Sequence, residues 1–332
     1  MIGRNLVIGL MLLFLDWSSA VVAQGLSNRR NTRSQVKCDP IGRVISDGDR
    51  RFKTGSLLCQ GVRLQVAKGA TVEVLCYANR KILRLKSSTD LDKCTPQATK
   101  MLPCTPENKS YCPKPKGPRE EGNIPTIISP YSSSILSHRP ELSWYAVAEA
   151  TSYTVQVKGA GVNWEKKVKS THLPYPKEQP ALQFGNAYKI AVIANRNESP
   201  IGVGTAVVNL LHSSDAKQVL EIVKRINSLG LPKDEAAFLD LNAAYMSKNL
   251  LHETIETLKS RVRAGSQHPT LYRVLGDRLL EAGLPDEAKR EYTTATLLAK
   301  RADNPAELAK AQAGLQRAQL YSQLPTRTNG DQ

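Results

Sequence analysis

Six cysteines are the residues of this 332-residue chain whose type and spacing most readily support chemistry. They fall in one stretch near its start: Cys38, Cys59, Cys76, Cys94, Cys104 and Cys112. An even number of cysteines predicts a disulfide framework if the chain is exported, although the sequence alone does not determine the pairing. Cys59 and Cys76 would form a pair if they lay on neighbouring strands. Zinc is the alternative, but there is no C-x-x-C pair and no histidine in this stretch, so disulfides are favoured.

Outside this stretch, no arrangement of residues indicates catalysis or metal binding. The five histidines are His138, His172, His212, His252 and His268, and none of them has an H-E-x-x-H or similar ligand spacing. The chain has no phosphate-binding glycine loop and no G-x-S-x-G elbow. The carboxylate pairs 234–235 and 286–287 stand at predicted helix starts, where they complement the helix dipole. We therefore expect a protein that is not an enzyme, with no cofactor and no metal.

Two copies of one apolar pattern, 34 residues apart, organise the stretch from Ala236 to Lys300. The corresponding residues are Phe238 and Tyr272, Leu241 and Leu275, Tyr245 and Leu279, and Leu258 and Tyr292. A fixed offset of this length is typical of helical repeats, in which each hairpin buries its apolar stripe against the next. The turns 230–232 and 283–285 each end one helix and begin another. A helix ending at Leu229 before the repeats and a helix from Pro305 after them complete a predicted array at 212–322.

The second copy resembles a tetratricopeptide repeat. The matching residues are Tyr272, Leu275, Gly276 and Leu279 on the first helix and Ala288, Tyr292 and Ala295 on the second. Gly276 and Ala288 would let the paired helices approach closely. The first copy departs from the pattern at Asn242, Thr254 and Arg261. The resemblance implies a concave groove for a protein partner, lined by Leu239, Ala243, Met246, Arg273, Asp277 and Leu280. An ordinary helical bundle is the alternative, and the neighbours of so short an array could fill its groove.

The first 23 residues have the pattern of a secretory signal peptide. Arg4 precedes an apolar run from Leu6 to Leu15, and small residues lead to a predicted cleavage site after Ala23. The run is too short to span a bilayer comfortably, with an uncleaved anchor as the alternative. We therefore expect an exported protein, periplasmic or extracellular, without a transmembrane segment after cleavage. Residues 24–37 are polar and basic, which predicts a flexible tail.

Residues 38–112 are predicted to form a cysteine-bearing β domain. Short β-prone runs at 42–45, 56–59, 62–66, 71–77 and 82–86 are separated by glycines and Asn79, which indicates a compact antiparallel unit. The domain resembles the FecR-like β domain of bacterial exported proteins in Gly48-Asp49-Arg50, in Gly55, and in residues 70–75 and 81–85. That family implies a recognition or sensing surface and no active site. The cysteines depart from its pattern.

A linker rich in proline and lysine, residues 113–123, leads to a second β module at 124–211. Apolar residues alternate along two of its predicted strands, as in a β-sandwich. The alternating sets are Tyr153, Val155 and Val157, and Tyr188, Ile190 and Val192. The module resembles a fibronectin type III domain, with Trp144 as the core tryptophan and Tyr188 as the late tyrosine. We expect both aromatic side chains in the core and not at a ligand site.

The formal net charge of +16 is concentrated at the cysteine-bearing end. Residues 24–123 contain 20 Lys and Arg against 9 Asp and Glu, whereas residues 212–332 contain 17 against 15. An anionic envelope polymer, an acidic protein or an anionic lipid surface could bind residues 24–123, with a solvated surface that has no specific partner as the alternative. Nucleic acid is not favoured, because the chain has an export signal and its basic residues lack interleaved aromatics.

The sequence thus predicts a multi-domain β plus α protein. Its parts are a small disulfide-bearing β domain, a fibronectin-type sandwich, a tetratricopeptide-like helical array and a disordered tail at 323–332. The first functional hypothesis is a non-catalytic exported adaptor that holds a protein partner through its helices and an anionic envelope component through its basic domain. The second is an envelope sensing or regulatory protein whose β domains bind a ligand or polymer. The third is a cell-envelope hydrolase.

Overall fold

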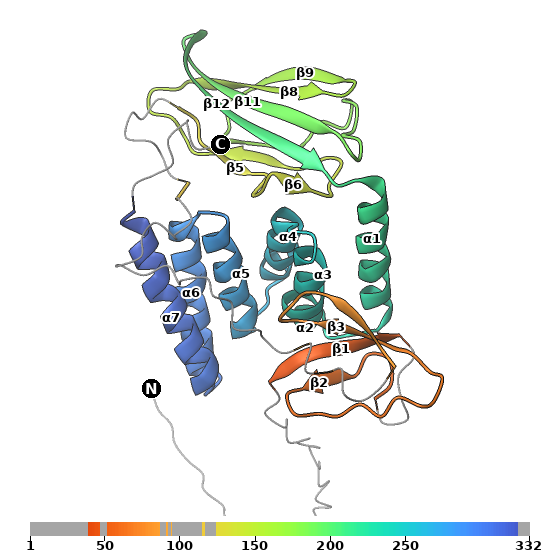
Figure 1. The fold of residues 1–332 in the computed structure, drawn as a ribbon. Coiled ribbons are helices and arrows are strands. Elements are labelled where there is room, and N and C mark those ends of the chain that lie inside the picture. Colours follow the sequence, from red (N-terminus) through yellow and green to blue (C-terminus); the bar gives the residue numbers. More distant parts are fainter. Residues whose placement is uncertain are drawn as a thin grey trace, which may run out of the picture. The chain divides into compact units, whose positions relative to one another are not determined.

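The computed structural model describes residues 39–46, 52–86, 91, 94, 115–116 and 124–324 (Figure 1). All of them belong to one compact unit, Asp39–Gln332. Both β-sheets and α-helices are present in this part. The predicted signal peptide and basic tail, three of the six cysteines (Cys38, Cys104 and Cys112) and most of the C-terminal tail lie outside the described residues. Within the described ranges, no helix combines the length and the apolar character needed to cross a membrane.

The β domain contains one antiparallel sheet. Its strands are β1 (Pro40–Ser46), β2 (Leu57–Cys59), β3 (Val72–Cys76) and β4 (Ile82–Leu85), in the order β2-β1-β3-β4. The predicted strand at 62–66 does not form. Its central residue Leu64 is nevertheless fully buried in the domain core. The apolar alternation at 62–66 therefore reflects the burial of the Leu64 side chain, and not pairing with a neighbouring strand.

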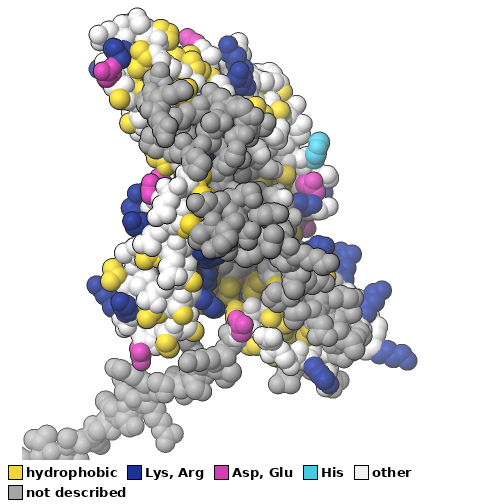
Figure 2. Space-filling model, turned by 60° about the vertical axis from the view of Figure 1, so that its left-hand side comes forward, with side chains coloured by type: hydrophobic (Ala, Val, Ile, Leu, Met, Phe, Trp, Pro, Cys, Tyr) yellow, Lys and Arg dark blue, Asp and Glu magenta, His cyan; other side chains and the backbone are white. Residues whose placement is uncertain are grey.

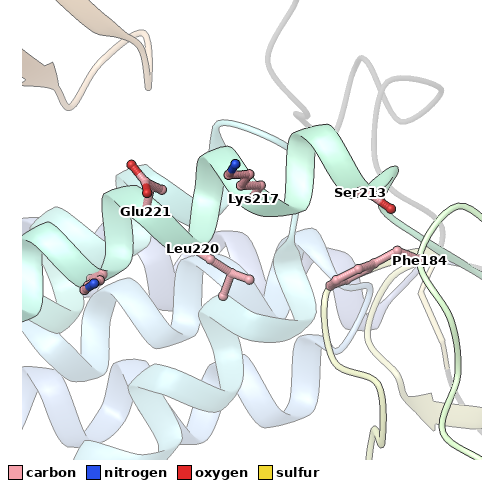
Figure 3. A pocket seen from close by; sticks show the side chains of 6 residues that line it. Phe184, Ser213, Lys217, Leu220 and Glu221 are labelled. Atoms are coloured by element: carbon pink, nitrogen blue, oxygen red, sulfur yellow. The ribbon is translucent and has the colours of Figure 1, made fainter.

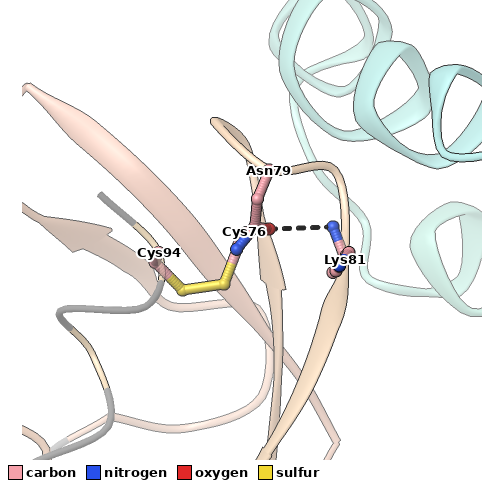
Figure 4. Close-up of a disulfide and its surroundings, with 4 residues drawn as sticks. All are labelled: Cys76, Asn79, Lys81 and Cys94. Atoms are coloured by element: carbon pink, nitrogen blue, oxygen red, sulfur yellow. Dashed lines mark hydrogen bonds between the residues drawn. A yellow bond between two sulfur atoms is a disulfide. The ribbon is translucent and has the colours of Figure 1, made fainter. Parts of the chain in front are cut away.

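A disulfide joins Cys76, at the end of β3, to Cys94, with their Cα atoms 5.0 Å apart (Figure 4). Both residues are buried in the domain core, so the bond holds Cys94 against the sheet. Cys59 is also disulfide-bonded. The predicted Cys59–Cys76 pair is wrong, because β1 lies between their strands, with Cys59 opposite Pro40 and Cys76 opposite Gly42.

The second β module is a sandwich of two sheets. One has the order β10 (His172–Leu173), β7 (Leu142–Trp144) and β5 (Ile127–Ser129). The other has the order β6 (Ser134–Ile135), β12 (Ser199–Leu210), β11 (Ala187–Arg196), β8 (Ser152–Gly159) and β9 (Val162–Val168). Trp144 and Tyr188 are only 2% and 1% exposed, which confirms their predicted core positions. The Tyr188 hydroxyl accepts a hydrogen bond from the Gln183 N–H at 2.9 Å and so fixes the loop before β11.

The C-terminal part is a series of helices. They are α1 (Ser213–Ser228), α2 (Lys233–Glu235), η3 (Ala236–Leu241), α3 (Asn242–Met246), α4 (Leu251–Arg263), α5 (Pro269–Glu281), α6 (Pro285–Arg301) and α7 (Pro305–Ser322). The segments α2, η3 and α3 form one continuous helix whose middle, η3, has π-helical hydrogen bonding. Proline opens α5, α6 and α7, where its missing N–H costs no hydrogen bond. The Asn304 side chain caps α7 by accepting a hydrogen bond from the Glu307 N–H.

Close packing at glycines joins α5, α6 and α7. A Cβ atom added to Gly276 of α5 would lie 2.9 Å from the ring of Tyr292 of α6, and one added to Gly314 of α7 would lie 2.2 Å from the same ring. The fully buried Tyr292 ring therefore fits between two helices that lack side chains at the point of contact. Gly276 has the role predicted for it, and Gly314 repeats that role on the closing helix.

Candidate binding surfaces

The structure places the six predicted groove residues in three different surroundings. Met246 and Leu280 are buried in the main core of the helical array, and Leu239 packs half-buried against the same core. Ala243 is buried in a separate cluster with Ile45 and Leu75 of the β domain. Arg273 and Asp277 are half-buried and polar. Of the six residues, these last two are the ones whose charges a partner could meet.

Arg273 and Asp277 belong to a network of hydrogen bonds that joins α5 to α6 and α7. Arg273 donates to Asp277 at 2.8 Å and also contacts Glu307 of α7. The other oxygen of the Asp277 carboxylate accepts a hydrogen bond from the Tyr292 hydroxyl at 2.7 Å and one from Arg317 at 3.2 Å. Burial, reinforced by the Asp277 charge, raises the pKa of Tyr292, which therefore stays a donor. The network is internally neutralised, and Arg317, with 55% of its side chain exposed, is its solvent-facing edge.

A buried ion-pair cluster fastens the β domain to the first helical hairpin. The guanidinium of Arg43 on β1 donates to Asp240 of η3 at 2.8 Å and to Glu235 of α2 at 2.5 Å. The Tyr77 hydroxyl donates to the same Asp240 oxygen at 2.7 Å. The side chain of Asp240 is fully buried and that of Arg43 is 3% exposed. A charge removed from water this completely is tolerated only with a partner, and here the partners lie on two different modules.

The electrostatics of this cluster follow from its burial. Desolvation raises the pKa of Asp240, although the bonds from Arg43 and Tyr77 lower it. Burial and the Asp240 charge raise the pKa of Tyr77 well above its ordinary value. The second Asp240 oxygen, Oδ2, is buried without a hydrogen-bond partner. The cluster is therefore sensitive to substitution, because loss of the Arg43 charge leaves the buried Asp240 carboxylate without a cation.

A second set of contacts stabilises the same interface between the β domain and the helices. Arg225 of α1 donates to the Glu73 carboxylate on β3 at 2.6 Å and to the Ile45 carbonyl at 3.1 Å. The same modules share an apolar cluster that contains Ile45 and Leu75 together with Ala236, Ala243 and Ala244. Small alanine side chains thus form the helical side of this contact. As a result, the β domain covers the first repeat at Ala243.

The sandwich contacts the helical array through α4. The Glu253 carboxylate accepts hydrogen bonds from the backbone N–H groups of Leu136 and Ser137, at 2.6 and 2.9 Å. Beside it, the His252 ring lies 5.6 Å from the Tyr131 ring and is 3% exposed. Burial lowers the pKa of His252, against the raising effect of nearby glutamates. The helical array is thus in direct contact with both β modules.

The solvent-facing surface of the β domain is basic. In its described ranges, 39–46 and 52–86, the exposed charged residues comprise six cations and one anion. The cations are Lys53, Arg63, Lys68, Lys81, Arg84 and Lys86, and the anion is Asp39. Figure 2 shows Lys and Arg side chains projecting into solvent from the lower part of the molecule. The domain therefore buries Arg43 in its joint with the helices and exposes most of its remaining cations.

An open hollow of about 420 Å³ lies beside α1 (Figure 3). Its lining residues are Phe184, Ser213, Lys217, Leu220, Glu221 and Lys224. Sequence reasoning missed this surface, although the signal was present. Apolar residues recur along α1 at the helical period, which places Val219 and Ile226 in the core. Leu220 falls outside this apolar stripe and is exposed, so core packing does not account for a leucine at this position.

No cluster of three or more His, Cys, Asp or Glu side chains suited to a metal ion occurs among the residues that the structure describes. The five histidines do not come together as a set. His138 packs on Phe184, with ring centroids 4.2 Å apart, and His268 packs on Phe238, with centroids 4.7 Å apart. His252 lies at the α4 junction, and His172 bonds the exposed carboxylate of Glu141.

No protein-family model matches the chain, and no curated protein matches it. Among solved structures, PcrH from Pseudomonas aeruginosa matches with 20% identity and a TM-score of 0.27, over 32% of this chain and 83% of that one. The fn3 domain of human collagen alpha-1(XX) matches with 17% identity and a TM-score of 0.22, over 35% and 94%. The twitchin kinase region from C. elegans matches with 22% identity and a TM-score of 0.21, over 30% and 17%.

Proposed function

We propose that this protein is a non-catalytic exported adaptor. Its basic β domain binds an anionic component of the cell envelope, either a polymer or a lipid surface, and its helical array holds a protein partner. In this proposal the β domain is FecR-like, the sandwich is of the fibronectin type III kind, and the helices are a short tetratricopeptide-like array. Residues 1–23 act as the export signal, and the mature protein works in the periplasm or outside the cell.

The observation that carries the proposal is that the β domain buries one of its cations and exposes most of the others. Arg43 is buried in the joint with Asp240 and Glu235, whereas six other Lys and Arg side chains of the domain are exposed. An anionic surface would meet the exposed set without disturbing the joint. Because clustered cations attract polyanions through their summed field, binding should weaken as salt increases.

The firm docking of the modules supports the adaptor part of the proposal. Ion pairs and shared apolar clusters connect the β domain to α1, α2 and η3, and backbone hydrogen bonds to Glu253 connect the sandwich to α4. A protein held by the helices would therefore be kept at a defined position relative to the envelope component. A flexible chain of modules would not have this property.

Charge reversal tests the envelope contact. The variant K53E/R63E/K68E should bind phosphatidylglycerol vesicles and the polymer polyglutamate at least tenfold more weakly than wild type in co-sedimentation at low salt. The matched control, K158E/K169E/K177E, makes the same change in net charge with exposed sandwich lysines that form no ion pair in the described part. If both variants bound the vesicles and the polymer equally weakly, net charge alone would govern binding. That result would refute the proposed role of the β-domain surface.

Crosslinking capture tests the partner contact. The helical array shares its core with both β modules, so the full mature chain is the appropriate bait. We expect one partner to be captured reproducibly from the envelope fraction, with crosslinks mapping to residues 212–322. Crosslinks confined to the β modules, or no reproducible partner, would refute the role of the helices.

A further inference from the structure

The hollow beside α1 has an apolar wall that is already in place. Leu220 is 47% exposed, which makes it one of four large apolar side chains on the surface of the described residues. Figure 3 shows Leu220 on the same side of α1 as the Phe184 ring, which comes from the sandwich. Phe184 is half-buried against Ala216 and Val219 and packs on the His138 ring. A ligand side chain inserted here would meet Leu220 and the Phe184 ring, which is already held against the core.

The rim of the hollow is positively charged. Lys217 and Lys224 are exposed and have no ion-pair partner in the part of the chain that the structure describes. One carboxylate, Glu221, stands between them, so the rim keeps a net positive charge. The N-terminus of α1 at Ser213 adds the positive end of the helix dipole. Because a rim of this kind attracts anions and an apolar wall binds hydrocarbon, the hollow suits a ligand that carries both.

The spacing of the two lysines defines the ligand further. They stand seven positions apart, which corresponds to about 10 Å along an α-helix. An extended peptide in the polyproline II conformation rises about 3.1 Å per residue with three residues per turn, so side chains three positions apart point the same way about 9 Å apart. Leu220 lies between the lysines, nearer to Lys217. An extended segment could therefore place acidic residues three positions apart on the two lysines and an apolar residue directly after the first acidic one.

We propose that this α1 hollow, lined by Phe184, Lys217, Leu220 and Lys224, binds an extended segment of the partner protein with the pattern acidic–apolar–x–acidic. The proposal rests on the proposed role of the helices in holding a protein, and it assigns that role to the outer face of α1. Charge complementarity and the lysine spacing favour a peptide over a lipid surface, because a bilayer would need a broad apolar face and Leu220 stands alone on the exposed side of α1.

Fluorescence anisotropy with labelled octapeptides tests the proposal on the full mature chain. The probe contains Asp-Phe-Ser-Asp between Gly and Ser residues. One comparison peptide replaces both Asp by Lys, and a second replaces Phe by Gly. We expect the probe to bind about tenfold more tightly than either comparison peptide, as is typical for the loss of one buried apolar side chain or of a pair of opposite charges.

Variants of the chain locate the binding. Leu220→Ser and the double change K217E/K224E should each weaken probe binding about tenfold. The controls are Leu297→Ser, which changes a similarly exposed leucine on α6, and K289E/K310E, which makes the same charge change on α6 and α7. Both controls should bind the probe as wild type does.

Several results would overturn the proposal. They are equal binding of the three peptides, equal effects of the test and control variants, and phosphatidylglycerol vesicle binding that depends on Leu220 while the probe does not bind. The adaptor function is judged separately by crosslinking capture. If Leu220→Ser retains the captured partner, the α1 hollow is wrong and the adaptor function stands. If wild type captures nothing, the adaptor function itself fails.

Discussion

Replacing Arg43 by methionine should destabilise the protein in a way that depends strongly on pH. Methionine keeps much of the volume of the side chain and removes its charge. The Asp240 carboxylate then stays fully buried, with the Tyr77 hydroxyl as its remaining hydrogen-bond donor among the described residues. Breaking a buried ion pair from one side typically costs about 3–5 kcal/mol. The structure sets a limit on this cost, because the carboxyl can take up a proton instead of remaining charged.

The limit follows from the ordinary pKa of aspartate. With a reference value of 3.8 for Asp240 and about 1.36 kcal/mol per pH unit, protonation costs about 4.4 kcal/mol at pH 7 and about 1.6 kcal/mol at pH 5. Burial already raises the pKa of Asp240, and removal of the guanidinium raises it further. A carboxyl with a raised folded-state pKa favours folding below pH 3.8, and this contribution is lost as the pH rises through the folded-state pKa. We therefore expect a loss of about 4 kcal/mol at pH 7 and about 2 kcal/mol at pH 5.

Equilibrium urea unfolding, followed by circular dichroism at both pH values, measures the effect. Arg84→Met is the control, because Arg84 pairs with Glu73 while 77% of its side chain is exposed, and its loss should cost less than about 1 kcal/mol at either pH. Combining Arg43→Met with Asp240→Leu should restore most of the stability, since both charges are then absent. An equal loss at pH 5 and pH 7, or a double variant as unstable as the single one, would refute the buried-charge explanation.

Three further predictions concern other parts of the molecule. Replacing Cys76 and Cys94 by alanine should lower the free energy of unfolding by about 3 kcal/mol, because the disulfide closes a loop with a sequence separation of 18. Urea unfolding measures this loss, and a value below about 1 kcal/mol would contradict the prediction. Gly314→Ala should destabilise by about 1–3 kcal/mol, although alanine normally favours helices, because its Cβ would lie 2.2 Å from the Tyr292 ring. Thermal unfolding should show partial recovery when Tyr292→Leu is added, and no recovery would refute the steric cause. Burial lowers the pKa of His252, so its neutral form contributes stability above pH 6.5 that is lost as the pH falls through the lower folded-state pKa. His252→Phe should therefore flatten the fall in melting temperature on the acid side. An unchanged pH profile of the melting temperature would count against this explanation.

The local elements were largely predictable from the sequence. Helix starts at Pro305 and at the turns 230–232 and 283–285 agree with the structure, because proline and glycine restrict the backbone locally. The core positions of Trp144 and Tyr188 were likewise predictable from alternation and aromatic size. The strand expected at 62–66 was not, because one buried leucine produces the same local pattern as a paired strand.

The candidate binding surfaces were less predictable, and Asp240 and Leu220 illustrate why. An aspartate in a helix is normally solvent-exposed, and nothing near Asp240 indicates a cation 197 residues away. The π-helical segment that carries it has no recognisable signal in the sequence Ala-Ala-Phe-Leu-Asp-Leu. Leu220 could have been found as a leucine outside the apolar stripe of its helix. Its significance depends on Phe184, which only the tertiary structure brings beside it.

By itself, the sequence determined the order of the β and α parts, the repeat spacing of the helices, the glycine at the tight helix contact and the concentration of positive charge at one end. Each of these follows from backbone preferences or from the periodicity with which apolar side chains recur. The tertiary structure alone decided that Cys76 pairs with Cys94, that Arg43 is buried against Asp240, and that the β domain covers Ala243. The physical reason is that a local pattern shows which side of an element avoids water, whereas the identity of the element that covers it depends on contacts between residues far apart in the chain.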